Sequence, residues 1–133
     1  MTTETAEGLT LRLDIPYPEA VEKVTEALAQ EGFGILTEID VKATLKKKLD
    51  ADFRPYIILG ACNPPLAHRA LTTELEIGLM MPCNVIVYDD NGQSVVSIAD
   101  PNLMASMSGS SGLDEVAAEA RTRLERVVAS LSR

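Results

Sequence analysis

Two cysteines, each followed by an asparagine, are the residues of this sequence best suited to chemistry. Cys62 and Asn63 follow a continuous apolar run, and Cys83 and Asn84 open a second apolar segment. Asn63 before Pro64 indicates the start of a helix, because asparagine caps helix N-termini and proline suits the first helical position. A Cys62 thiolate just outside that helix would lie near the positive end of its dipole, which lowers the pKa of a thiol.

His68 falls one to two turns into the same predicted helix and is a candidate base for a Cys62 nucleophile. The sequence offers no third group to orient such a base, so an enzyme is an alternative and not the leading hypothesis. The competing interpretation is structural, because free cysteine is among the most often buried residues. A disulfide between Cys62 and Cys83 is a further alternative, but in the cytoplasm it would form only as a redox event.

The same region is also a candidate site for a soft metal or a small anion. Cys62, Cys83 and His68 are soft or borderline metal ligands, and Asp100 or Glu74 could add an oxygen. The metal hypothesis is weak, because the chain has no CxxC or HExxH motif. A small anion would instead use backbone N–H groups at a helix N-terminus.

Other residues carry weaker indications. Four methionines are expected to pack in the core or to line an adaptable apolar groove: Met80, Met81, Met104 and Met107. Asp100 before Pro101 is interpreted as the end of a strand. The stretch from Asn102 to Gly112 is rich in Met, Ser and Gly and predicts a flexible connection. Its Ser and Gly residues lack the lysine of a phosphate-binding P-loop.

The elements that position these residues alternate between strands and helices. Hydrophobic periodicity predicts strands over 9–15, 33–39, 56–62, 79–89 and 93–99. It predicts helices from residue 17 to a stop at Gly32, over 41–49 after an Asp40 cap, and from 64 to about 77 before Gly78. A long amphipathic helix is predicted from about 113 to 131, with Ser111 as its capping residue.

Asn91–Gly92 predicts a tight hairpin, because both residues tolerate the positive φ of such turns. The hairpin makes two strands antiparallel. The expected fold is therefore α+β, with one mostly antiparallel sheet and helices packed on one face. We expect a single domain over residues 8–133, with residues 1–7 frayed.

Composition excludes several classes of function. The chain has 133 residues and a formal net charge of −8, which argues against nucleic-acid and polybasic membrane binding. Two cysteines are too few for a disulfide scaffold. Neither a signal peptide nor a membrane-length apolar run is evident, so we expect a cytoplasmic protein with reduced thiols.

The sequence resembles a known family at four places. The resemblance lies in Gly34–Lys42, Tyr56–Pro64, Met81–Tyr88 and Asp100–Pro101, and it extends over about residues 8 to 131. These segments are similar to the family called domain of unknown function 302. The resemblance implies a β-α-β(4)-α core and association as homodimers, with the middle helices as additions to that core. It brings no established activity or cofactor.

The leading hypothesis is a small homodimeric binding or accessory protein without proven catalysis, whose ligand and cofactor the sequence does not identify. Its candidate ligand-binding residues are Cys62, Asn63, His68, Cys83, Asn84 and Asp100. The alternatives are an enzyme or redox protein that uses Cys62 as a thiolate, and a structural module for protein interaction. No nucleic acid or membrane is expected among its partners.

Overall fold

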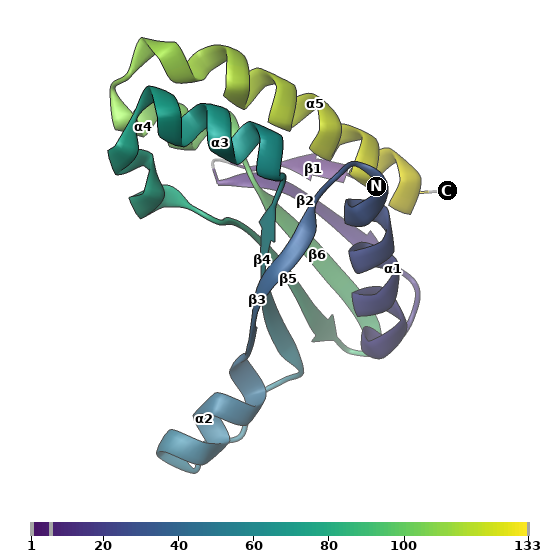
Figure 1. The fold of residues 1–133 in the computed structure, drawn as a ribbon. Coiled ribbons are helices and arrows are strands. Elements are labelled where there is room, and N and C mark those ends of the chain that lie inside the picture. The colour runs from purple at the N-terminus through teal and green to yellow at the C-terminus, as the bar shows by residue number, and fades with distance from the viewer. Residues whose placement is uncertain (1, 6, 133) are drawn as a thin grey trace.

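The computed structural model describes residues 2–5 and 7–132. Its centre is a six-stranded sheet in which neighbouring strands all run antiparallel (Figure 1). In spatial order the strands are β1 (Thr2–Glu4), β2 (Gly8–Leu13), β6 (Gln93–Ala99), β5 (Cys83–Asp90), β4 (Tyr56–Cys62) and β3 (Gly34–Asp40). The predicted α+β fold with an antiparallel sheet is thereby confirmed.

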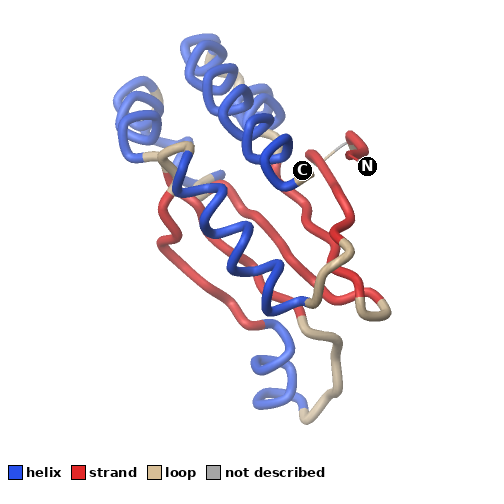
Figure 2. The backbone as a smooth tube through the Cα atoms, turned by 90° about the vertical axis from the view of Figure 1, so that its right-hand side faces the viewer, coloured by secondary structure: helices blue, strands red, loops and turns tan. Residues whose placement is uncertain are grey.

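Within the described residues, five α-helices accompany the sheet: α1 (Tyr17–Gln30), α2 (Val41–Leu49), α3 (Pro64–Thr73), α4 (Pro101–Ser108) and α5 (Asp114–Leu131). Figure 2 shows α1 lying across one face of the sheet. The long α5 contacts α1, α3 and α4. Helix α2 lies between β3 and β4 in the chain and extends away from the sheet (Figure 1). None of the helices in the described part of the chain combines the length and apolar composition that a membrane span requires.

Side chains from one face of the sheet fill the main core. Residues on the helix-covered face of the sheet, such as Leu11, Leu59 and Ile98, are at most 2% exposed. They pack with Leu28 of α1 and Leu124 of α5 in one cluster. Because successive strand residues point to opposite faces, the same strands present a second set of side chains to the open face.

In the part of the chain that the structure describes, three α-helices begin at a residue whose side chain caps them. The carboxylate of Asp40 accepts a hydrogen bond from Ala43 N (2.9 Å), and Asn63 Oδ1 accepts one from Leu66 N (3.4 Å). Asp100 Oδ1 accepts from Asn102 N (2.9 Å). Asp and Asn are favoured there because they satisfy N–H groups that have no partner within the helix. The predicted caps at Asp40 and Asn63 are therefore confirmed.

Several local predictions were wrong. Residues 2–4 of the segment expected to be frayed form β1 and pair with β2. The expected flexible connection contains α4, because Asp100 and Pro101 start a helix. A 3₁₀ helix, η1 (Leu75–Met80), contains Gly78, and β5 begins only at Cys83.

The start of α5 also differs from the expectation. Ser111 makes no capping hydrogen bond and instead begins a one-turn 3₁₀ helix, η2 (Ser111–Leu113). The core arrangement implied by the family resemblance is present. Its β-α-β(4)-α order corresponds to β2, α1, the strands β3 to β6, and α5. Helices α2, α3 and α4 are insertions into that order.

Candidate functional site: an apolar cavity with two cysteines in its wall

A cavity of about 100 Å³ lies between α3, η1, α4, the start of α5 and the adjoining ends of β4 and β5. None of the described residues that line it is charged. Its wall contains Cys62, Asn63 and Cys83, three of the residues singled out in the sequence. The remaining wall is mostly alanine, methionine and aliphatic side chains, so the cavity suits an uncharged or soft ligand.

Small residues keep this space open. The wall includes Ala70 of α3, Ala105 of α4, and Ala117 and Ala120 of α5. Ala105 and Ala117 are buried and belong to a small cluster with Ile77 and Leu113, separate from the main core. An alanine ends at Cβ, so helices that face each other through alanines leave room that leucines would fill.

Cys83 is placed by the pairing of β4 and β5, in which it lies opposite Ala61. Its thiol donates a weak hydrogen bond to Ala99 O, with a sulfur–oxygen distance of 3.6 Å. Withdrawal from water, with a smaller contribution from the nearby Asp100 carboxylate, raises the pKa of the Cys83 thiol to about 12. At neutral pH Cys83 is therefore a protonated thiol and a poor nucleophile.

Cys62 lies one residue beyond Ala61, the partner of Cys83, so the two cysteines adjoin diagonally across β4 and β5. By strand alternation, Cys83 shares the helix-covered face with Val85 and Val87, whereas Cys62 belongs with the opposite face. Both thiols are free and half-buried. The alternation disfavours a disulfide, because its Cβ vectors must converge.

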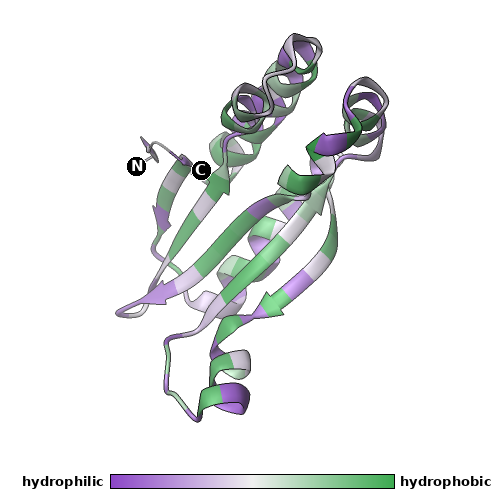
Figure 3. Cartoon of the chain, turned by 90° about the vertical axis from the view of Figure 1, so that its left-hand side faces the viewer, coloured by the Kyte–Doolittle hydropathy of each residue, from purple (hydrophilic) through white to green (hydrophobic). Residues whose placement is uncertain are grey.

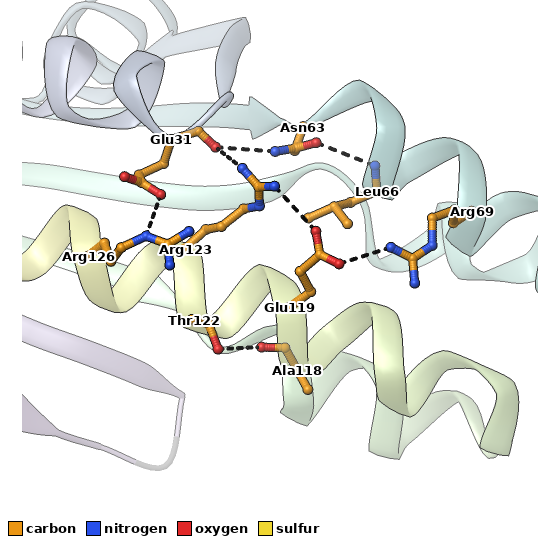
Figure 4. Close-up of polar contacts among 9 residues, drawn as sticks. All are labelled: Glu31, Asn63, Leu66, Arg69, Ala118, Glu119, Thr122, Arg123 and Arg126. Atoms are coloured by element: carbon orange, nitrogen blue, oxygen red, sulfur yellow. Dashed lines mark hydrogen bonds and ion pairs between the residues drawn. The ribbon is translucent and has the colours of Figure 1, made fainter.

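Asn63 has a structural role. While its Oδ1 caps α3, its Nδ2 donates to the carbonyl oxygen of Glu31 after α1 (3.3 Å), as Figure 4 shows. Arg123 of α5 donates to the same carbonyl oxygen (3.3 Å). Between these elements Gly32 has a φ of +86°, and a Cβ there would lie 2.9 Å from Asn63 Nδ2. Asn63 thus joins α1 to α3 directly behind the cavity.

The N-terminus of α3 has no donors for an anion. Pro64 and Pro65 carry no N–H group. The N–H groups of Leu66 and Ala67 already donate to the side chain and the backbone oxygen of Asn63. The sulfur and apolar character of the wall therefore favours a soft or apolar ligand over the small anion that the sequence also suggested.

Asp100 lies next to the cavity but does not line it. Besides capping α4, its carboxylate forms an ion pair with Arg121 of α5 at 2.8 Å. Arg121 also pairs with Glu4 of β1 at 3.2 Å. These contacts tie α5 to the strand end that precedes α4, which gives Asp100 a structural part in positioning two walls of the cavity.

The other sequence candidates lie elsewhere. His68 is exposed on α3 and is not among the residues that line the cavity. Asn84 is exposed on β5 and borders a second hollow, which is also lined by Thr10 and Ser97. Glu74 caps η1 by accepting from Glu76 N at 3.1 Å. Within residues 2–5 and 7–132, no three His, Cys, Asp or Glu side chains gather to hold a metal ion.

Sequence reasoning missed most of the wall. Met80, Met81 and Met104 line the cavity, as the groove interpretation of the methionines suggested, whereas Met107 is 63% exposed and lies outside it. The alanines of α5 were not identified as cavity residues, although a start rich in Ala followed by larger residues is visible in its sequence. Arg121 and Arg123 carried no signal beyond their charge.

Comparison with known proteins gives a family and a fold. The family model described as domain of unknown function DUF302 matches residues 9–131. A crystal structure titled as an uncharacterized conserved protein DUF302 from Bacillus stearothermophilus is 32% identical, with a TM-score of 0.84. The match covers 96% of this chain and 98% of that one. No curated protein matches the sequence.

Proposed function

The chain belongs to the DUF302 family, and because that description names no activity, we propose from the geometry of the cavity that the protein binds a small, uncharged and largely apolar ligand. The observation that carries the proposal is a cavity of about 100 Å³ without a charged lining residue. A dry apolar cavity of about 150 Å³ is enough to bind benzene or xenon. The ligand therefore has about the size of a few heavy atoms.

The wall of the cavity is partly exposed to solvent. Met80, Met81 and Met104 are only half-buried at its wall, and methionine side chains change rotamer at little cost because they are unbranched. Their movement would widen the cavity without disturbing the main core. The half-buried Cys62 and Cys83 add polarizable groups that favour soft or aromatic ligands.

The test is to add benzene or xenon to the full chain and to monitor binding through changes in NMR chemical shifts. Ala117→Leu would place a larger side chain in the cavity and abolish the shifts, whereas Ala118→Leu, at an exposed position beside it on α5, would leave them unchanged. Ala105→Val on α4 is a second filling variant if the first perturbs folding. Equal binding by the filled and control variants would refute the proposal.

We also propose that the protein acts as a homodimer through the open face of its sheet. Ile39, Ile58 and Ile86 lie side by side across three strands on that face. Next to them Tyr56 and Tyr88 stack with ring centroids 5.3 Å apart. Figure 3 shows this face with apolar residues in several adjacent strands. Contiguous exposed apolar surface of this kind is typical of interaction sites.

Light scattering tests the dimer. Ile86→Lys would give a monomer, whereas Leu79→Lys, on the 83% exposed side chain in η1, would leave the dimer intact. A monomeric wild type would refute the dimer. If only Leu79→Lys gave a monomer, the dimer interface would lie at η1 and not on the open face of the sheet.

The remaining alternatives stay untested predictions. An enzyme with a Cys62 nucleophile predicts rapid alkylation of Cys62 at neutral pH, and a purely structural module predicts that ligand binding is absent while the dimer persists. Two free thiols on opposite faces of a strand pair are consistent with the expected reducing, cytoplasmic compartment.

A further inference from the structure

Sulfur is concentrated at the cavity. The chain contains two cysteines and five methionines, hence seven sulfur atoms. Five of the seven residues line this one cavity: Cys62, Met80, Met81, Cys83 and Met104. They come from the end of β4, the end of η1, the start of β5 and the first turns of α4. The topology thus brings together soft donors that are separated by up to 42 positions in the sequence.

We propose that this cavity is a Cu(I) site in which the Cys83 thiolate and methionine thioethers bind the ion. The proposal goes beyond the apolar ligand proposed above and assigns a second kind of occupant to the same cavity. Thiolates and thioethers are soft ligands that select Cu(I), whereas thioethers are poor ligands for Zn²⁺, which takes nitrogen, oxygen and thiolate donors.

Charge balance also favours a monovalent ion. None of the described lining residues is charged, and burying an uncompensated charge in such a place is costly. Binding converts Cu⁺ and the neutral Cys83 thiol into a Cu–S bond and one released proton. The product, one monovalent cation and one thiolate, has no net charge, and the neutral thioethers leave that balance unchanged.

The surroundings of Cys83 fit this exchange. Its thiol donates only a weak hydrogen bond to Ala99 O, at a sulfur–oxygen distance of 3.6 Å, so no strong hydrogen bond is broken when an ion takes the place of the proton. Proton release makes the affinity rise with pH, as for other ligands that bind as the deprotonated group.

The experiment is anaerobic titration of the full chain with Cu(I) in competition with the chelator bicinchoninate. One Cu(I) per chain is expected, with one proton released. Cys83→Ser would weaken binding by more than the roughly 100-fold that loss of an outer-shell partner produces. Paired Met80→Leu and Met104→Leu changes would weaken it while conserving wall volume. Met107→Leu, at the exposed methionine outside the cavity, would have no effect.

Benzene and xenon binding is measured on the same variants. If the wild type cannot take Cu(I) from bicinchoninate, the copper proposal fails. If benzene still binds to the methionine-to-leucine variants in that case, the apolar-ligand proposal stands. If Cys83→Ser binds Cu(I) as tightly as the wild type, the assigned ligand set is wrong. If Ala117→Leu removes neither Cu(I) nor benzene binding, the cavity itself is not the site.

Discussion

The two hydrophobic clusters of this molecule are packed differently, although α5 takes part in both. In the main core Leu28, Leu59 and Leu124 are at most 1% exposed and large side chains interlock. In the second cluster Ala105 and Ala117 face a cavity of about 100 Å³. One helix therefore supplies leucine and valine to a filled core through its C-terminal half and alanine to a cavity through its N-terminal half.

This difference in packing indicates that the two clusters contribute differently to stability and to the proposed binding. Filled cores stabilise a fold by apolar burial and close contacts, and each cavity lost or created changes that stability. A cavity that persists beside a filled core forgoes such contacts. We therefore assign stability mainly to the first cluster and ligand binding to the second, and the following predictions test that division.

Leucine truncation should show the largest effect. Leu59→Ala removes a side chain that is 0% exposed in the main core and should cost about 2–5 kcal/mol of unfolding free energy. Leu66→Ala, a wall residue that is 5% exposed, should cost about 2 kcal/mol, because one side of it already lacks contacts. Urea unfolding measures both. Equal costs would contradict the division.

High pH should destabilise the cavity end through Cys83. The pKa of its thiol is about 12 in the folded chain against an ordinary 9.0. Below pH 9 both states are protonated, and above it only the unfolded state loses the proton. The unfolding free energy should therefore fall from pH 9 toward 12, by up to about 1.4 kcal/mol per pH unit. Cys83→Ala should remove the Cys83 contribution to this slope, and Cys62→Ala, measured in parallel, should retain it.

Asn63, which joins α1 to α3, should have an intermediate effect on the free energy of unfolding. Asn63→Ala removes the cap of α3 and the donor to Glu31 O and should cost about 1 kcal/mol or somewhat more. Asn63→Asp keeps the capping acceptor and loses only the donor, so its cost should be smaller. Thermal unfolding of the two variants distinguishes these contributions, and a larger cost for the aspartate would show that the contact with Glu31 dominates.

Surface ion pairs on α5 should matter least. Arg126 pairs with Glu31 at 2.8 Å, but the arginine side chain is 55% exposed. Arg126→Ala should change the unfolding free energy by at most about 1 kcal/mol, less at high salt, because exposed pairs gain little Coulomb energy in water. A loss comparable to that of Leu59→Ala would mean that α5 is held by charge and not by packing.

Local signals in the sequence predicted most of the sheet. The alternation before Pro16 and the apolar run 56–62 mark real strands, and Asn91–Gly92 marks the hairpin, with φ values of +55° and +90°. Such signals depend on neighbouring residues alone. Helix α4 was missed because its Ser and Met residues resemble a loop, although Asp100–Pro101 repeats the cap-and-proline pattern used to identify α3 at Asn63–Pro64.

The site was harder to predict because it depends on contacts between distant segments. Cys62 and Cys83 adjoin only through the pairing of β4 with β5, and Met104 reaches them only because α4 packs against η1 and α5. Nothing local to His68 distinguishes a catalytic histidine from the exposed residue that it is. The two prolines after Asn63 did carry information, since they leave the start of α3 without donors for an anion.

The cavity is built largely from insertions. Helix α3 and η1 connect β4 to β5, and α4 connects β6 to η2 and α5, so all three segments lie outside the sheet. Changes in these segments can alter the shape and chemistry of the wall without shifting any strand pair. The binding preference proposed for the cavity is therefore free to change, while the sheet and the filled core preserve the scaffold.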